Sequence, residues 1–582
     1  MSEELLLSKN FDTCDATRLS RRSTPKITLL LIAGFLLLFF LQGWFFIRAN
    51  SQTVDEAAHL AAGYSYLVTG DFRLDSEHPP LLKAFQALPL LLFFRLPFNP
   101  DPQLWLEKDA FGIGYEWLYK SGLPADQLLF LSRLTNLFLG VFLVALMGCW
   151  AYRLWGGWAA SLAVALGSLE PNFVAHSGLV TTDIGVTLFI LLTVYLLWEY
   201  VSRPSWQLLL ATGLAFGLAL LSKFSALILL PIIFCILSAF IVSGEDFYFL
   251  PPGVNTASTR KKILPATVLF ALILAIAAFT IPLGYAFKGF RMWISGLELL
   301  WSLTKDGRQS FFLGDYSRQG WWNYFIVAFL IKTPIGTLLL IIASVILYRA
   351  GKPLSRRDSF FLFLPPLVIF LLTTRAKINL GLRHVLPVYP FLFLLASRLA
   401  TFIPTRGGLM ISAISGALLF TAGSVLRIAP HQLAYFNEFV GGPDRGYRYL
   451  SDSNLDWGQD LKGLKAYMVK EKLEIIYLSY FGSASPSYYG IRYQHAPGSW
   501  LWEWPPPRVK ISRHAQRDVL AISVYNLQDV ASPDDPLFRW LWKDAPIAKI
   551  GYSIFIYDLT EHPDDLRRLN ETYRKAGIPA PP

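Results

Sequence analysis

The sequence predicts a polytopic α-helical membrane protein of about eleven transmembrane helices with a C-terminal soluble α/β domain. Three observations support this fold class. Hydrophobic residues make up 54% of the 582 residues and charged residues only 16%, and the mean hydropathy is +0.42. Apolar runs long enough to cross a bilayer recur as far as residue 427. Beyond that point the long runs stop, and β-rich segments at 474–481, 519–525 and 550–557 follow a helical pattern at 460–470.

The apolar runs set the predicted topology. They lie at residues 27–47, 128–151, 156–170, 184–201, 206–222, 224–242, 263–283, 322–348, 359–374, 385–403 and 408–427. Basic residues gather in the short loops on one side of this arrangement, and the positive-inside rule makes that side cytoplasmic. The chain then divides into a cytoplasmic N-terminal tail (1–26), a transmembrane domain (27–427) with a large outer loop (48–127), and an extracytoplasmic domain (428–582). A cysteine-free outer domain and the absence of a lysine-rich retention signal favour a bacterial inner membrane.

The predicted catalytic loop follows the first span and reads TVDEAAHLAAGYSYLVTGDFRLDSEHPPLLK over residues 53–83. Asp55 and His59 fall at helical spacing, so a short helix lying on the membrane would turn both side chains toward one side. After His78, two prolines form a rigid corner before Lys83, which is placed to meet a phosphate as a point charge. The alternative is an amphipathic interfacial helix with ordinary polar decoration.

A second acid lies on the same predicted side of the membrane. Asp183 opens the fourth span, where an N-cap region is the alternative interpretation. Two carboxylates that face one cavity can share a proton, a substrate hydroxyl or a divalent cation. Lys223 interrupts an apolar run near the outer boundary and is interpreted as a snorkelling side chain.

The outer loop at 374–384 breaks the charge bias of the chain, because it carries Arg375, Lys377, Arg383 and His384 on the side that has few basic residues. Basic residues at a membrane boundary usually have an anionic partner. Arginine can grip a phosphate with a bidentate fork. The loop therefore predicts a lipid-phosphate site, with a simple headgroup anchor as the alternative.

These motifs resemble a known group of proteins. An acidic pair soon after the first span, Asp55-Glu56, then His-Pro-Pro-Leu and Lys83, resembles the integral-membrane glycosyltransferases of the GT-C superfamily that use polyprenyl-phosphate sugars. Protein O-mannosyltransferases and aminoarabinose transferases belong to this superfamily. The resemblance covers roughly residues 27–427 and includes a late basic-aromatic-Leu-Pro pattern at 383–387, with His384 where the relatives tend to have tyrosine. It implies direct displacement with inversion at the anomeric carbon and no covalent enzyme intermediate.

The predicted reaction moves a sugar from a polyprenyl-phosphate carrier to an acceptor hydroxyl on the extracytoplasmic face. Asp55 is the predicted base, and Glu56 and Asp183 are supporting acids. The predicted substrate-binding residues are Lys83 and Arg383 on the phosphate, together with His384, His59, His78, Arg375 and Lys377. The expected partners are the donor, membrane lipids and a protein, lipid or glycan acceptor. The net charge of +11 is spread among apolar segments, which argues against nucleic acid.

Two other functions stay open. A transferase or ligase for a larger lipid-linked glycan would keep the same fold. A secondary transporter is disfavoured because the polar clusters lie in outer loops and no internal repeat is visible. A divalent cation is the one cofactor that the sequence leaves open: Asp55, Glu56, His59, His78 and Asp183 include suitable ligands, but their spacing does not decide for or against a metal. The segment SDSNLDWGQD at 451–460 is interpreted as a helix-capping turn, with sugar stacking on Trp457 as the alternative.

Overall fold

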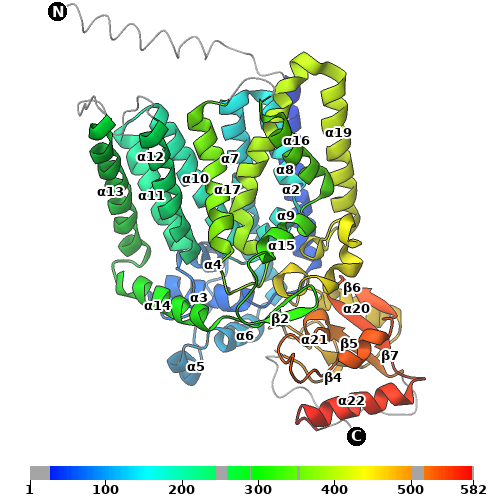
Figure 1. Cartoon of the computed structure of the whole chain (residues 1–582). Coiled ribbons are helices and arrows are strands. Elements are labelled where there is room, and N and C mark those ends of the chain that lie inside the picture. Colours follow the sequence, from blue (N-terminus) through cyan, green and yellow to red (C-terminus); the bar gives the residue numbers. More distant parts are fainter. Residues whose placement is uncertain (1–25, 244–258, 289, 350–353, 500–516, 580–582) are drawn as a thin grey trace, which may run out of the picture.

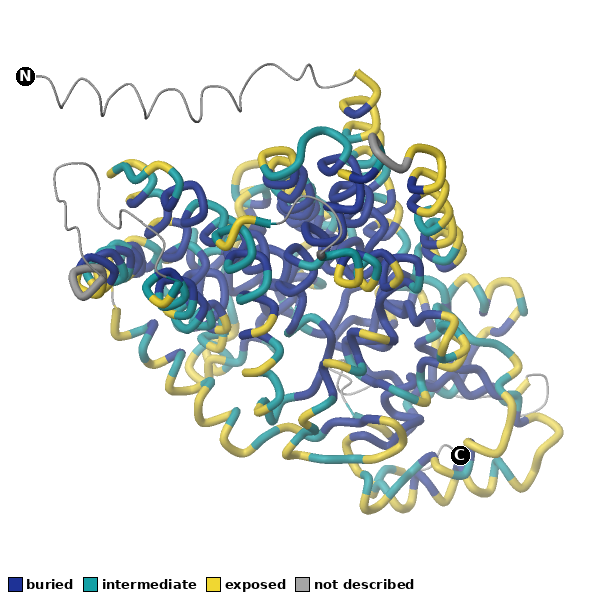
Figure 2. The backbone as a smooth tube through the Cα atoms, turned by 45° about the horizontal axis from the view of Figure 1, so that its top comes forward, coloured by how far each residue is buried: buried dark blue, intermediate teal, exposed yellow. Residues whose placement is uncertain are grey.

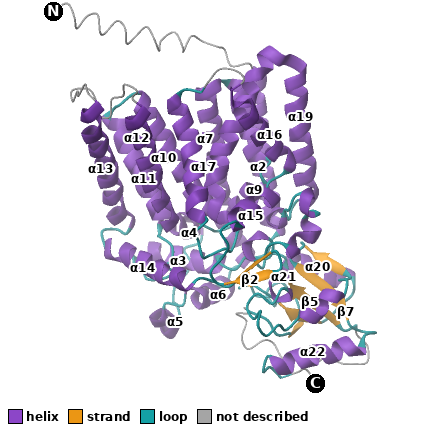
Figure 3. Cartoon of the chain, viewed as in Figure 1, coloured by secondary structure: helices purple, strands orange, loops and turns teal. Residues whose placement is uncertain are grey.

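The structure, a computed structural model, describes residues 26–243, 259–288, 290–349, 354–499 and 517–579. A bundle of long helices forms the larger part of the molecule, and short helices and a small sheet lie together at one end of it (Figure 1). Figure 3 shows that strands are confined to that end. Buried backbone runs through the centre of the bundle, while exposed backbone follows its periphery and the outer end (Figure 2). Of the predicted tail, only Lys26 falls within the described residues.

Six helical segments among the described residues are long and apolar enough to cross a membrane. They are α2 (Lys26–Ala49), α7 (Ala125–Trp155), α10 (Asp183–Ser202), Phe224–Ser243 (η1, Phe224–Ile228, with α12, Leu229–Ser243), Ile263–Gly284 of α13 (Thr259–Gly284) and Gly407–Ile428 of α19 (Ile403–Ile428). The bent pair α15 (Tyr324–Lys332) and α16 (Ile335–Ile346) can count as a seventh. Shorter apolar helices cover other predicted spans, so six or seven of the predicted eleven are supported and the others stay predictions.

Proline explains why the predicted span at 322–348 is broken. The two helices α15 and α16 meet at an angle of 113°. Pro334 has no N–H to donate to the preceding turn, and it pushes Thr333 into an extended conformation with φ −96° and ψ 134°. The predicted span at 385–403 is likewise divided, into η3 (Leu382–Val388), α18 (Tyr389–Ser397) and η4 (Arg398–Phe402).

The remaining helices of the bundle and its connections have the following bounds: α8 (Gly157–Ser168), α9 (Pro171–Ser177), α11 (Trp206–Ser222), η2 (Leu347–Arg349), α17 (Arg356–Thr373), η5 (Gln432–Ala434), η6 (Glu438–Val440), η7 (Pro443–Arg448) and η8 (Asp452–Asn454).

The predicted outer loop folds into a layer of short helices beneath the bundle (Figure 1). The layer comprises α3 (Glu56–Thr69), α4 (Leu81–Phe93), α5 (Pro102–Glu107), α6 (Ala110–Lys120) and, from later in the chain, α14 (Phe290–Asp306) with the antiparallel pair β1 (Ser310–Phe312) and β2 (Asp315–Ser317). Two glycines let these helices approach closely. A Cβ on Gly63 would lie 2.1 Å from the Lys83 carbonyl oxygen, and one on Gly114 would lie 2.6 Å from the Ala57 carbonyl carbon. The helix that begins after Asp55 is thereby fixed from two sides.

The C-terminal part contains a five-stranded sheet with strand order β4-β3-β5-β7-β6. The strands are β3 (Ile476–Ser479), β4 (Tyr493–His495), β5 (Val519–Ser523), β6 (Ala548–Ile550) and β7 (Ile554–Asp558), and the helices are α20 (Leu461–Lys470), α21 (Val524–Leu527), η9 (Arg539–Lys543) and α22 (Pro563–Lys575). Strands β4, β3 and β5 run parallel, and β7 and β6 join antiparallel. Strands β3, β5 and β7 and helix α20 occur where the sequence predicted them. That 428–582 is a separate soluble domain stays a prediction.

Candidate active site

The adjacent acids at the start of α3 have opposite environments. Asp55 is the residue before the helix, and 22% of its side chain is exposed. Glu56 is fully buried. Arg133 of α7 donates to both Glu56 oxygens, from Nε to Oε1 at 2.8 Å and from a terminal nitrogen to Oε2 at 2.5 Å. The same arginine donates to the carbonyl of Ile47 in the last turn of α2 and to those of Asn50 and Ser51 just after it, so it ties the end of that span to the start of α3.

Glu56 is therefore held as a carboxylate. Burial alone would raise its pKa, but the ion pair with Arg133 and the backbone N–H groups of Thr53 and Val180 outweigh burial, and the net pKa lies below the usual value. Both oxygens are already occupied by these donors. A carboxylate without a free oxygen is poorly placed to take a proton from a substrate.

Two predicted site residues, Asp183 and Arg383, meet beside Asp55. Asp183, in the first turn of α10, is 1% exposed and accepts from Lys223 Nζ at 2.6 Å. Arg383, in η3, places one terminal nitrogen 3.4 Å from Asp55 Oδ2 and 3.8 Å from Asp183 Oδ2. Arg383 thus lies between Asp55 and Asp183, two of the three predicted catalytic acids. Its Nε has no hydrogen-bond partner among the described residues.

The sequence analysis interpreted Lys223 as a snorkelling side chain, but the structure shows that it does not snorkel. The residue lies between α11 and η1, only 9% exposed, and its ammonium is paired with Asp183 rather than directed to the membrane surface. An isolated lysine in an apolar run carries no sequence signal for its partner. The pairing depends on the packing of α10 against α11, which brings the two residues together.

The structure places Lys83 in a second cluster, where its charge is used internally. Its side chain is fully buried, and Nζ donates to the Asp75 carbonyl at 2.6 Å, to Asp75 Oδ2 at 3.0 Å and to the His78 carbonyl at 2.8 Å. All three N–H donors of the ammonium are therefore occupied. In this geometry Lys83 closes the 70–80 loop and does not face a free phosphate position.

The two predicted histidines of this loop belong to the same cluster. His59 Nε2 lies 3.6 Å from the Asp75 carboxylate, and its Nδ1 lies 3.0 Å from the Val180 carbonyl. The His59 and His78 rings are 5.2 Å apart. Burial raises the pKa of Asp75, but the combined effect of Lys83 and the two histidines is larger and opposite, so the net pKa lies below its usual value. Burial lowers the pKa of His78 to about 3, which keeps that ring neutral.

A pocket of about 230 Å³ lies against His78. Its lining residues are Tyr66, Phe72, Arg73, Ser76, His78, Pro80, Lys108, Tyr285, Arg291, Met292 and Ser295. Three of these are cations, and Arg73 is paired with Asp71 at 2.8 Å. The pocket combines cationic and apolar walls, which suits an anionic amphiphile.

The other predicted ligands are more dispersed. His384 follows Arg383, and its Nε2 has no hydrogen-bond partner among the described residues; burial lowers the pKa of this ring well below the usual value. Arg375 is exposed after α17. Lys377 donates to the Lys305 carbonyl at the end of α14, 3.0 Å away. The interactions of the described residues do not join Arg375 or Lys377 to the acids of the site.

The turn at 451–460 reaches the site, although the sequence interpretation made it a helix-capping turn. The Trp457 ring lies 4.3 Å from the Arg383 guanidinium carbon, and its carbonyl accepts from Val54 N–H at 3.0 Å. Asn454 Oδ1 accepts from Leu382 N–H at 2.9 Å. Asp460, at the N-cap of α20, makes no side-chain cap hydrogen bond. The turn therefore leads into α20 where the capping interpretation placed the helix start, but without a side-chain cap, and it also holds the residues that precede Asp55 and Arg383.

Metal binding has no structural support within the described ranges. No group of three or more His, Cys, Asp or Glu side chains there is arranged to hold a metal ion. The divalent cation considered from the sequence stays an open expectation.

Comparison with known families finds a match to the N-terminal half of the chain. The family model of dolichyl-phosphate-mannose-protein mannosyltransferases matches residues 32–292, which include Asp55, Lys83 and Asp183. The match confirms the resemblance to integral-membrane glycosyltransferases that use polyprenyl-phosphate sugars. A comparison with curated proteins finds no match.

Several solved structures are distantly similar. ArnT from Cupriavidus metallidurans, bound to undecaprenyl phosphate, shares 12% identity at a TM-score of 0.47, covering 91% of this chain and 97% of that chain. The S. cerevisiae protein O-mannosyltransferase Pmt1-Pmt2 complex, bound to the sugar donor, shares 21% identity at a TM-score of 0.35, covering 48% and 36%. The Archaeoglobus fulgidus oligosaccharyltransferase shares 11% identity at a TM-score of 0.38, covering 69% and 54%.

Proposed function

We propose that this chain, whose N-terminal membrane portion matches the mannosyltransferase family, transfers a sugar from a polyprenyl-phosphate carrier to an acceptor hydroxyl, with Asp55 as the base. The arrangement of the three acids supports this most strongly. Glu56 and Asp183 are buried and each is held by its own cation. Asp55 is partly exposed and only loosely held, 3.4 Å from Arg383. A general base needs an oxygen that can reach the acceptor hydroxyl, and of the three acids Asp55 meets this need.

Arg383 takes the role of the cation that faces the departing phosphate. Its free Nε leaves a donor for a phosphate oxygen. Asp183 and Lys223 hold a fixed pair of charges next to it, so the guanidinium is kept in place before the reaction begins. Charge increases on the phosphate as the sugar leaves, and a cation already positioned there stabilises the transition state more than the ground state.

The donor occupies the pocket beside His78. Arg73, Lys108 and Arg291 supply positive charge, and Phe72 and Tyr285 supply an apolar wall for the first isoprenyl units. This assignment removes the phosphate-binding role from Lys83, whose donors are all used by Asp75 and His78, and divides it between Arg383 and the pocket cations. Lys83 becomes a positioning residue of the 70–80 loop.

The reaction is a direct displacement. Asp55 takes the proton of the acceptor hydroxyl, and the oxygen attacks the anomeric carbon. The bond from that carbon to the carrier phosphate oxygen breaks, and the phosphate leaves with the electron pair. Attack from the opposite side inverts the anomeric configuration.

The site lies at the end of the bundle that carries the outer layer and the C-terminal sheet (Figure 1). We assign this end to the extracytoplasmic side of a bacterial inner membrane, with the N-terminus in the cytoplasm, because Arg153 and Arg203 of the short basic loops lie at the opposite ends of α7 and α10. The acceptor is a protein, lipid or glycan hydroxyl. The second candidate, a transferase for a larger lipid-linked glycan, uses the same residues and differs in the donor alone.

The test follows loss of label from radiolabelled polyprenyl-phosphate sugars, with purified protein in nanodiscs and membrane extract as the source of acceptor. Polyprenyl-phosphate mannose is the first donor to test, because the matching family is named for a dolichyl-phosphate-mannose donor. Asp55→Asn is compared with wild type and with Asp315→Asn, the same change at an exposed acid on β2. We expect label loss with wild type and Asp315→Asn but not with Asp55→Asn. Equal loss with Asp55→Asn would overturn the base assignment, and no loss with any monosaccharide donor would favour the larger glycan.

A further inference from the structure

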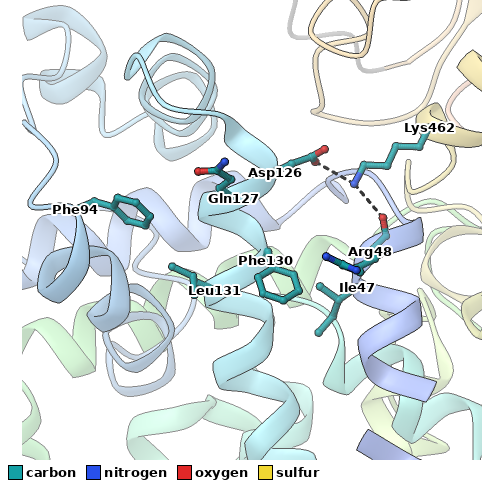
Figure 4. A pocket seen from close by; sticks show the side chains of 8 residues that line it. All are labelled: Ile47, Arg48, Phe94, Asp126, Gln127, Phe130, Leu131 and Lys462. Atoms are coloured by element: carbon teal, nitrogen blue, oxygen red, sulfur yellow. Dashed lines mark hydrogen bonds and ion pairs between the residues drawn. The ribbon is translucent and has the colours of Figure 1, made fainter. Parts of the chain in front are cut away.

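A larger pocket, of about 440 Å³, opens at the outer end of α2 and contains no residue of the site described above. Figure 4 shows that its side chains come from α2, α7 and α20, with Phe94 from the end of α4. The lining residues are Ile47, Arg48, Phe94, Asp126, Gln127, Phe130, Leu131 and Lys462. Its charged residues Arg48, Asp126 and Lys462 gather at one end; Phe130 and Leu131 lie about one turn further along α7, Ile47 lies beside Arg48, and Phe94 lies at the opposite side (Figure 4).

The pocket lies at the depth of lipid headgroups. Arg48 is in the last turn of the membrane-spanning α2, and its guanidinium lies 5.5 Å from the ring of Trp44, one turn deeper. Trp44 in turn meets Phe130 edge-on at 5.0 Å. Tryptophan and arginine at the end of a span mark the membrane–water interface. Exposed apolar side chains continue along the same two helices toward the membrane interior, at Leu41, Phe45, Phe138 and Phe142.

The three charged residues of the pocket, Arg48, Lys462 and Asp126, carry a net charge of one positive unit. Lys462 Nζ lies 3.1 Å from Asp126 Oδ1 and also donates to the Arg48 carbonyl at 3.3 Å. Lys462 and Asp126 therefore balance each other. Arg48 has no carboxylate within ion-pair distance among the described residues, and its side chain is exposed toward the pocket. One further negative charge would complete the site.

We propose that this pocket binds the phosphodiester headgroup of an anionic phospholipid, with the phosphate between Arg48 and Lys462 and the acyl chains along α2 and α7. A phosphodiester carries one negative charge, which matches the excess charge of the pocket. The volume falls in the range of small-molecule sites. The apolar wall of Ile47, Phe130 and Leu131 meets the start of the acyl chains.

The bound lipid would join the membrane bundle to the C-terminal part of the chain. Lys462 belongs to α20, and the N–H of its neighbour Leu461 is held by Ser51 Oγ from the segment that leads to Asp55. A headgroup held between Arg48 and Lys462 therefore fastens α20 to the end of α2. This inference does not depend on the proposed transferase reaction.

Native mass spectrometry tests the proposal, with the full-length protein released from nanodiscs that contain phosphatidylglycerol and phosphatidylcholine. We expect one retained phosphatidylglycerol on wild type, and a loss of retention of about fivefold for each cation removed in Arg48→Gln and Lys462→Gln. Arg95→Gln is the matched control, because Arg95 is an exposed cation beside Phe94 that does not line the pocket. Unchanged retention in the Arg48→Gln/Lys462→Gln double variant would overturn the site.

Two further measurements separate this proposal from simpler explanations. Asp126→Asn removes the competing carboxylate and is expected to increase phosphatidylglycerol retention, which a merely disrupted fold would not do. A competition series adds polyprenyl phosphate to the same nanodiscs. Displacement of phosphatidylglycerol at equal concentration would assign the pocket to the carrier lipid and overturn the phospholipid assignment, whereas retained phosphatidylglycerol supports it.

Discussion

The indole of Trp457 lies against the guanidinium of Arg383, 4.3 Å from its central carbon, and thereby joins the C-terminal part of the chain to the membrane bundle at the candidate site. The stack leaves the nitrogen edge of Arg383 directed to Asp55 and Asp183. The Trp457 carbonyl also receives the N–H of Val54, next to Asp55. One residue of the C-terminal part thus contacts the segments that carry both the proposed base and the proposed phosphate ligand.

Trp457→Ala should reduce transfer by positioning Arg383 less well. A cation–π contact that is removed from water is worth about 2 kcal/mol, or roughly thirtyfold in rate if the whole amount acts in the transition state. Trp457→Phe keeps an aromatic face and should retain most of the activity. The measurement is kcat and KM for label release, with melting temperature as the check on folding. A phenylalanine variant as inactive as the alanine variant would refute stacking as the cause.

The two acids around Arg383 should respond differently to the same change. Asp55→Asn should lower transfer by about 10²- to 10⁴-fold, the usual contribution of a general base, with an unchanged melting temperature. Asp183→Asn leaves Lys223 buried without its partner and should also lower the melting temperature, because an uncompensated buried charge is costly. Melting curves and transfer rates of the two variants, measured side by side, show whether Asp55 acts in catalysis alone and Asp183 also in stability. Equal stability losses would contradict the assignment of separate roles.

Glu56 should act through folding and not through chemistry. Glu56→Gln leaves Arg133 buried without a carboxylate, and breaking a buried ion pair in this way costs about 3–5 kcal/mol. The additional change Arg133→Met removes the unpaired charge and should restore part of the lost stability. The quantity to follow is the melting temperature in nanodiscs. A Glu56→Gln protein with the melting temperature of wild type but without sugar-transfer activity would show that Glu56 has a catalytic role instead.

The sequence allowed the main residues of the site to be predicted where topology alone brings them together. Asp55, Asp183 and Arg383 were all assigned to outer loops, and they meet in the structure. Lys83 was predicted to face a phosphate, but in the structure it is paired with Asp75. Asp75 reaches Lys83 because its backbone adopts φ 48°, and no local sequence pattern predicts that conformation. Trp457 and Lys223 were missed as site residues, since their roles depend on contacts between distant segments. The prediction of a single span at 322–348 did not take account of Pro334, which ends α15 at the preceding turn and so divides the span into two helices.

Lys83 and Arg291 provide a direct test of where the carrier phosphate binds. Lys83→Met should lower the melting temperature, because Asp75 and the His78 carbonyl lose a buried donor. Arg291→Gln, at the wall of the pocket beside His78, should raise the donor KM several-fold and leave the melting temperature unchanged. A raised donor KM for Lys83→Met without loss of stability would return the phosphate-binding role to Lys83.

The stability of the 70–80 loop should depend on pH through His78. Burial lowers the pKa of this ring from 6.5 to about 3, with Lys223, Lys83 and His59 opposing its protonation and Asp75 favouring it. Below about pH 6.5 the unfolded chain binds a proton here that the folded chain does not, so the contribution of His78 to stability is complete above that pH and falls as the pH drops toward 3. The fall in melting temperature from pH 7.5 to pH 5 should therefore be smaller for His78→Gln than for wild type. The change His562→Gln, at an exposed histidine, should leave this fall as large as in wild type. If His78→Gln loses as much stability on acidification as wild type, the ring is not buried as a neutral group and the geometry of the pocket wall must differ from that described.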